Sequence, residues 1–214
     1  MKTTVRKNNP SYISLLKFWE KHCCLDKWHI DWLKQNIEII KPLPKGEIVY
    51  VEGERQKSIF FVCRGALARI VYDTNQNMHI LSIALQEMAL MSTTHLFSST
   101  PSSGNITALH PNTRIIKIPY SSIINYIHEV PEISTLFNIL NNKEKKQLFQ
   151  LRYLSSIKNP IDRYLYFNDN LKELKNSITN IQAAQLLGIS IATIIRAQKM
   201  EKLPKVPKKS VSRE

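Results

Sequence analysis

The sequence predicts an α+β fold in which a β-rich block lies between two helical regions. Short runs rich in β-branched and aromatic residues, separated by turn residues, fill positions 46–118. Apolar residues at helical spacing precede this block and follow it. The 214 residues suffice for one large or two modest domains, and the 43% hydrophobic content suffices for their cores. We therefore expect an antiparallel β sandwich or barrel flanked by helices.

The β-rich block is expected to contain six strands and to form a domain of its own. Two short helices should precede it within residues 12–40, with a break around residues 24–26. Turn residues such as Gly53, Gly65 and the polar stretch 73–77 separate the strands. The six runs are GEIVYVEGE, SIFFVCRG, ALARIVYD, MHILSIAL, NITAL and RIIKI.

A long helical region follows the β-rich block. The β pattern stops after Pro119, and helical spacing continues to residue 157 with a break near Pro131. Asn159 and Pro160 end this region, because the residue before a proline disfavours the α conformation. The expected domains are the β domain with its N-terminal helices (1–130), a connecting helix (131–158) and a C-terminal helical domain with a basic tail (159–214).

The connecting helix carries an apolar stripe close to the spacing of a coiled-coil seam. Two interpretations stay open: the stripe pairs with a second protomer, or it packs onto the chain's own β domain. The polar block NNKEKKQ at 141–147 falls where the seam should continue, so the sequence leaves the continuity of a dimer helix undecided. The stripe consists of Ile133, Leu136, Leu140, Leu148, Leu151 and Leu154.

Residues 180–200 have the spacing of two short helices that cross at a tight turn. Ala184 provides the small side chain at the close approach, Gly188 the turn, and Ile194 the contact of the second helix with the first. This spacing is typical of a DNA-binding helix-turn-helix, although an ordinary helical hairpin in a core has it too.

The second of these helices would present polar and basic residues outward, after Ser190 as its cap. Arg196 is the expected base contact, with contact to phosphate alone as the alternative. Ser190 and Lys199 would contact the phosphate backbone, and Thr193 either a phosphate or a thymine methyl. The predicted DNA-binding residues are Ser190, Ala192, Thr193, Arg196 and Lys199.

The charge of the chain favours a polyanionic partner. There are 30 Lys and Arg against 17 Asp and Glu, which gives a net charge of +13. Seven of these basic residues and only two acidic ones lie between Arg196 and the end, where double-stranded DNA would gain sequence-independent contacts. The same tail also fits a solvated basic segment. Pro204 and Pro207 disfavour strands there, so a winged hairpin should be truncated or absent.

The sequence offers little support for a metal site, for catalysis or for export. Cys23, Cys24 and Cys63 contain no CxxC pair, and the HCC stretch at 22–24 lacks a fourth ligand. We expect no cofactor and no enzymatic activity, since neither a catalytic triad nor a phosphate-binding glycine loop is present. Without an apolar leader or a membrane-length apolar run, the protein is expected in the cytoplasm.

The order of these parts resembles the Crp/Fnr family of bacterial transcription regulators, which are related to the catabolite activator protein. The resemblance covers residues 28–200, and the segment DRYLYF at 162–167 is similar to the branch common in Bacteroidetes. It implies an antiparallel β-roll of the jelly-roll, cyclic-nucleotide-binding type, a long dimer helix and a winged-helix-like helix-turn-helix. Its best local matches are KGEIVYVEGE at 45–54, SIFFVCRGALARIV at 58–71 and QAAQLLGIS at 182–190.

The same resemblance implies an effector pocket in the β-roll. In the family a glutamate binds the ribose and an arginine pairs with the cyclic phosphate. Here Glu87 stands at the ribose position, but Ser102 stands where the arginine belongs, followed by Ser103. Loss of a charge-assisted contact worth about 1.5–3 kcal/mol argues against a cyclic nucleotide. The insert 92–104 is either a loop or a rebuilt pocket.

Three functions are considered for a sequence with these features. The first is a homodimeric transcription regulator that senses an effector other than cAMP, or none. The second is a sensor or protein-interaction module without specific DNA binding, favoured by Ile191 and Ile195 around the outward face. The third is a cupin-like metal enzyme, whose ligands would be His79, His95, His110 and Glu87, although the HxH spacing is missing.

Overall fold

A computed structural model of the protein describes residues 5–91 and 100–201. Three parts of the chain for which predictions were made lie outside these residues: His95, most of the insert 92–104, and the basic tail. The prediction that a winged hairpin is truncated or absent concerns this tail. The chain divides into two compact units, residues 1–152 and 153–214. The three-part division expected from the sequence stays a prediction.

The first unit begins with the two expected helices, α1 (Pro10–Glu20) and α2 (Lys27–Asn36). The side chain of Asn9 caps α1, whose first residue is a proline, a residue well suited to the first helical position. Asp26 caps α2 in a capping box with His29, in which each side chain bonds the other's backbone. The cap at Asp26 lies in the break that the sequence predicted between the helices.

Two four-stranded antiparallel sheets follow, with the orders β1-β8-β3-β6 and β2-β7-β4-β5. Each of the six expected runs contains one strand. The two further strands, β1 and β6, have two residues each and no alternation of their own, so that only their pairing with β8 and β3 reveals them. The strands are β1 (Glu38–Ile39), β2 (Ile48–Tyr50), β3 (Ser58–Arg64), β4 (Leu67–Tyr72), β5 (Met78–Ala84), β6 (Ala89–Leu90), β7 (Asn105–Ala108) and β8 (Arg114–Pro119).

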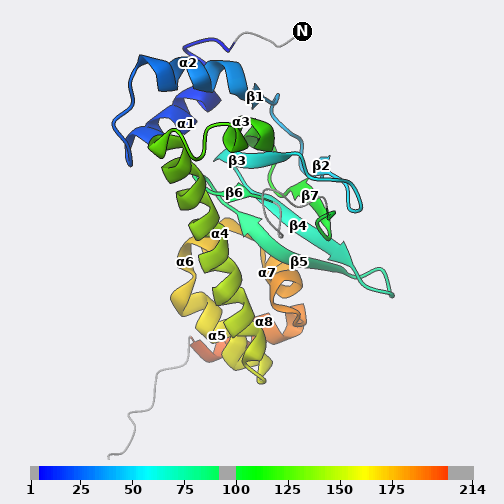
Figure 1. Ribbon diagram of the computed structural model, residues 1–214. Coiled ribbons are helices and arrows are strands. Elements are labelled where there is room, and N and C mark those ends of the chain that lie inside the picture. The colour runs from blue at the N-terminus through cyan, green and yellow to red at the C-terminus, as the bar shows by residue number, and fades with distance from the viewer. Residues whose placement is uncertain (1–4, 92–99, 202–214) are drawn as a thin grey trace, which may run out of the picture. The chain divides into compact units, whose positions relative to one another are not determined.

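Strand β3 shows how the sheets are layered, because its two faces enter different cores. Phe60 and Val62 join a cluster with apolar residues of both sheets. Ile59, Phe61 and Cys63, which alternate with them, pack against the helices of the unit instead. Figure 1 shows α1 and α2 grouped with the short helix α3 (Tyr120–Ile124). A strand buried on both faces explains the continuous apolar run SIFFVC.

Helix α4 (Pro131–Ser156) runs unbroken through the polar block 141–147. Ile133, Leu136 and Leu140 are buried in the cluster that holds α1, α2 and β3. The first half of the predicted stripe therefore packs onto the chain's own β domain. Leu148, in the second half, is 37% exposed.

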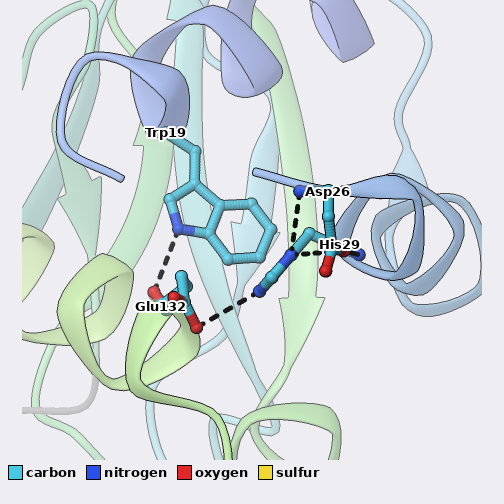
Figure 2. A network of polar contacts seen from close by, with 4 residues as sticks. All are labelled: Trp19, Asp26, His29 and Glu132. Carbon is cyan, nitrogen blue, oxygen red and sulfur yellow. Dashed lines mark hydrogen bonds and ion pairs between the residues drawn. The ribbon is translucent and has the colours of Figure 1, made fainter. Parts of the chain in front are cut away.

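The N-terminal helices are fastened to the start of α4 by a small polar network (Figure 2). The indole N–H of Trp19 donates to the backbone carbonyl of Glu132 at 3.0 Å. His29 lies between two carboxylates, with Nδ1 at 2.8 Å from Asp26 Oδ1 and Nε2 at 3.3 Å from Glu132 Oε2. This network fixes the direction in which α4 leaves the helical layer.

The second unit is helical, with α5 (Pro160–Asn170), α6 (Lys172–Ser177), α7 (Asn180–Leu187) and α8 (Ile191–Glu201). Asn159 caps α5 by accepting a hydrogen bond from the backbone N–H of Ile161, and Pro160 is its first residue. Asn159 and Pro160, which the sequence predicted to end the long helical region, therefore also begin α5. Among the described helices, none combines the length and apolar character that a membrane span requires.

Candidate nucleic-acid interface and effector site

Helices α7 and α8 are joined by a three-residue turn. Thr179 and Gln182 form a capping box at the start of α7. Gly188, the predicted turn residue, ends this helix in the left-handed conformation, with φ 62° and ψ 39°. The N–H of Ile189 then donates to the carbonyl of Ala184 at 3.1 Å, which tightens the turn.

The two helices pack through the residues whose spacing first indicated them. Ala184 and Leu187 on α7 are buried, and Ile194 on α8 is fully buried. Helix α5 supports α8 from behind, because the side-chain amide of Gln198 donates to the hydroxyl of the buried Tyr164 at 2.9 Å. One face of α8 is therefore held by the rest of the unit and the opposite face is exposed.

Arg163 on α5 is a structural residue that the sequence analysis did not identify. Its guanidinium donates to the carbonyl of Leu187 at 2.8 Å and to the carbonyl of Ile157 at 2.8 Å. It thereby satisfies a carbonyl at the end of α7, beside the turn that leads into α8. The motif DRYLYF contained this residue, but its spacing gave no indication of the distant carbonyl.

The structure brings the predicted DNA-binding residues together on the first three turns of α8. Ser190 caps the helix: its hydroxyl accepts from the backbone N–H of Thr193 at 3.1 Å and lies 2.9 Å from that residue's hydroxyl. Ala192, Arg196 and Lys199 are exposed, whereas Thr193 is half-buried. Arg196 thus has an exposed side chain, while the two hydroxyls are bonded to each other.

The interior of the β domain holds a buried cation that the sequence analysis overlooked. Arg69 on β4 is 1% exposed, and its guanidinium donates to three protein acceptors. These are the carbonyl of Met91 at 2.7 Å, the side-chain oxygen of Gln56 at 3.0 Å and the carbonyl of Ser103 at 3.2 Å. The guanidinium also lies 5.9 Å from the ring centroid of Tyr50, a cation–π distance.

Glu144 on α4 supplies a buried carboxylate to the same region. It is 7% exposed and accepts from the backbone N–H of Met91, whose carbonyl accepts from Arg69. Burial raises the pKa of Glu144 to about 7, against the opposing effects of Arg69 and the Met91 hydrogen bond. Burial likewise lowers the pKa of Arg69, and Glu144 opposes that shift.

The polar block at 141–147 therefore forms hydrogen bonds with the β domain. Gln147, also buried, accepts from the backbone N–H of Ile83 on β5 at 2.9 Å. Lys143 donates to the carbonyl of Glu87 at 3.0 Å. In the sequence, polar residues that make such contacts cannot be distinguished from those of a solvated helix face.

The predicted effector residues are placed among protein partners. Glu87, at φ 61°, forms an ion pair with Lys21, the residue that follows α1, at 2.6 Å, and its side chain is 32% exposed. Ser102 is buried, and its backbone N–H donates to the hydroxyl of Tyr50 at 3.1 Å. Ser103 is exposed, while its carbonyl accepts from Arg69. The structure therefore brings Ser102 and Ser103 to the Arg69 region, and Glu87 to the end of α1.

No group of three potential metal ligands is found in residues 5–91 and 100–201. His79, one of the cupin-like candidates, lies 3.2 Å from Asp73 in the β4–β5 hairpin. Cys63 is buried, which raises the pKa of its thiol to about 12 and disfavours the thiolate that metals bind.

Solved structures share this fold at low sequence identity. A transcriptional regulator of the Crp/Fnr family from Eubacterium rectale superposes with a TM-score of 0.63 at 14% identity, over 87% of this chain and 86% of its own. A cyclic nucleotide-binding domain containing protein from Listeria monocytogenes gives 0.62 at 18%, over 89% of each chain. FixK2 from Bradyrhizobium japonicum gives 0.62 at 16%, over 77% and 83%. The chain thus has the fold of Crp/Fnr regulators. No protein-family model and no curated protein matches it.

Proposed function

We propose that this protein is a DNA-binding transcription regulator of the Crp/Fnr type, without enzymatic activity, in the Bacteroidetes-type branch to which DRYLYF is similar. The observation that carries the proposal is the helix pair α7–α8 with Arg196 and Lys199 exposed on α8. Residues 153–214 contain 11 Lys and Arg against 5 Asp and Glu, a net charge of +6 that favours a phosphate backbone. The partner is double-stranded DNA, and the place of action is the cytoplasm.

The regulator acts as a homodimer in this proposal. Phe149 is 75% exposed and Tyr153 is 50% exposed, one turn apart on α4. Burial of large apolar side chains against a second protomer would remove this surface from water. A two-fold pair of α8 helices then contacts successive major grooves about one helical turn apart.

The β-roll in this proposal does not use a cyclic nucleotide. Arg69 donates three hydrogen bonds to protein acceptors among the described residues, so only part of its guanidinium is left for a cyclic phosphate. Glu87, expected at the ribose, is paired with Lys21. An effector of another kind, or no effector, agrees with these contacts. Isothermal titration with cAMP should detect no binding, and micromolar affinity would contradict this part of the proposal.

The decisive experiment for DNA binding starts from a random duplex library, from which the purified full-length protein selects its preferred fragment. Fluorescence anisotropy then compares this fragment with a scrambled one over a salt series. Arg196→Ala should reduce the site preference by about 10-fold or more, because one bidentate base contact is worth about 1–3 kcal/mol. Lys172→Ala, an exposed lysine on α6, is the matched control and should keep it.

A second function is favoured by one observation. Ile191 and Ile195, exposed on α8, agree with a small-molecule sensor or protein-interaction module that has lost specific DNA binding. Selection that returns no enriched fragment, with equal affinity for all duplexes, would favour this alternative over the regulator.

A further inference from the structure

The exposed face of α8 carries an apolar pair in its first two turns. Ile191 is 42% exposed and Ile195 is 45% exposed. Four residues apart on a helix, their side chains lie next to each other, at about 5–6 Å between Cβ atoms. Ala192, also exposed, adjoins them. The apolar strip formed by Ile191, Ala192 and Ile195 is called the isoleucine strip below.

Most hydrogen-bonding side chains near this strip are engaged within the protein. The hydroxyls of Ser190 and Thr193 bond each other at 2.9 Å. The amide of Gln198 contacts Tyr164 at 2.9 Å and Asn180 at 3.3 Å. Within the described residues of α8, Arg196 is exposed next to the strip, and its guanidinium offers a fork of N–H donors. A sequence preference read by this face must rest largely on apolar contact.

The major groove offers one apolar group for such contact. Among the four bases only thymine presents a methyl group at its groove edge, whereas guanine presents two acceptors suited to an arginine. We propose that Ile191 and Ile195 determine specificity by packing on thymine methyl groups, beside a guanine contacted by Arg196. The preferred half-site is therefore rich in thymine around that guanine. This inference rests on the proposed DNA binding of α8.

Charge identifies DNA, rather than a protein, as the partner of the isoleucine strip. Arg196 and Lys199 border the strip on the same exposed face, and the unit that carries it has a net charge of +6. Cations beside a small apolar strip complement a groove whose walls are phosphates. A stable protein interface buries about 800 Å² on each partner, far more than two half-exposed isoleucines provide.

The test removes single methyl groups from DNA. In the fragment selected by the wild-type protein, each thymine is replaced in turn by deoxyuridine, which keeps every hydrogen-bonding group and lacks only the methyl. Anisotropy should show about a fourfold loss of affinity for each contacted methyl, the equivalent of one buried methylene. In Ile191→Ala and Ile195→Ala, thymine and deoxyuridine should be bound within about 1.5-fold of each other at the contacted position.

Ile181→Ala is the matched control, since Ile181 is 56% exposed on α7 and outside the strip. This variant should retain the wild-type loss on methyl removal. Circular dichroism verifies that all three variants keep the helical content of the wild type. If the wild-type protein distinguishes the selected fragment from a scrambled one but binds deoxyuridine and thymine equally, the inference is overturned and the proposed function stands. If it distinguishes no fragment at all, both fall.

Discussion

Arg69 and Glu144 both form hydrogen bonds with the backbone of one residue, Met91. The guanidinium of Arg69 donates to the Met91 carbonyl at 2.7 Å, and the carboxyl group of Glu144 accepts from the Met91 N–H at 3.2 Å. Strand β4 and helix α4, 75 positions apart in sequence at these two residues (144 minus 69), are thereby connected through the end of β6. The interior of the β domain and the helix that leaves it are therefore coupled through the backbone of Met91.

Removal of Arg69 should therefore destabilise the first unit strongly. At pH 8, where Glu144 is mostly ionised, Arg69→Met leaves the carbonyls of Ser103 and Met91 without this donor and Glu144 without its countercharge, at a cost of about 3–5 kcal/mol. Urea unfolding followed by tryptophan fluorescence measures this, because all three tryptophans, at 19, 28 and 32, lie in this unit.

A double mutant separates the charge effect from the packing effect. Arg69→Met with Glu144→Leu removes both buried charges, so the pair should cost less than the sum of the single variants. Arg64→Met is the control, because Arg64 is exposed at the end of β3 and should change stability little. Strict additivity of Arg69→Met and Glu144→Leu would show that the two residues are not coupled.

Glu144 should give the stability of the first unit a characteristic pH dependence. Burial raises its pKa in the folded state from 4.5 to about 7, so folding favours the protonated form. The resulting stabilisation is fully present below pH 4.5 and is lost as the pH rises through 7, at no more than about 1.4 kcal/mol per pH unit.

Glu144→Gln cannot titrate and should lack this loss of stability between pH 4.5 and 7. Urea midpoints measured at half-unit pH intervals compare the two proteins. Glu129→Gln, at an exposed position before α4, should follow the wild-type profile. Parallel profiles for wild type and Glu144→Gln would contradict the raised pKa.

Two glycines with similar φ angles should differ in their tolerance of a methyl group. Gly65 has φ 82°, and a Cβ there would lie 2.6 Å from the hydroxyl oxygen of Thr113, which is fully buried and bonded to the His110 carbonyl. Gly53 has φ 87° with open space around it. Gly65→Ala should therefore lose about 1–3 kcal/mol more than Gly53→Ala in urea unfolding. Equal losses would mean that Thr113 yields without cost.

Substitutions of Ser190, the cap of α8, should separate the stability of the helix from the affinity for DNA. Ser190→Ala removes the hydroxyl that accepts from Thr193 N–H, at a cost of about 1 kcal/mol to the helix. Ser190→Asp should restore stability, since aspartate caps equally well, yet weaken DNA binding through its charge. Thermal denaturation and anisotropy measure the two effects. An aspartate variant that binds DNA as tightly as wild type would place Ser190 away from phosphate.

Local patterns in the sequence predicted much of the fold. The spacing of Gly188 and Ile194 predicted the turn and the packing of α7 and α8, and the apolar run SIFFVC predicted β3. Strands β1 and β6 were not predicted, because two residues form a strand only when a distant partner is present. Local sequence patterns therefore predict the elements that do not need a distant partner in order to form.

The interior polar network could not be predicted in this way. Arg69 stands in an ordinary apolar strand, and its acceptors come from residues 13, 22 and 34 positions away. Glu144 resembles any charged residue on a solvated helix face. Their roles follow from the pairing of the sheets and the packing of α4, which depend on long-range contacts. The exposed face of α8 was predicted correctly in outline, since Arg196 and Lys199 do lie on it.

The most direct test of the central claim compares the affinity of the full-length protein for its selected fragment and for a scrambled duplex, in one salt concentration, by fluorescence anisotropy. A sequence-specific regulator should bind the selected fragment at least about 10³-fold more tightly. Arg196→Ala should reduce that ratio by about 10-fold or more, while Lys172→Ala leaves it unchanged. Equal affinity for both duplexes would contradict the assignment of α8 as a DNA-reading helix.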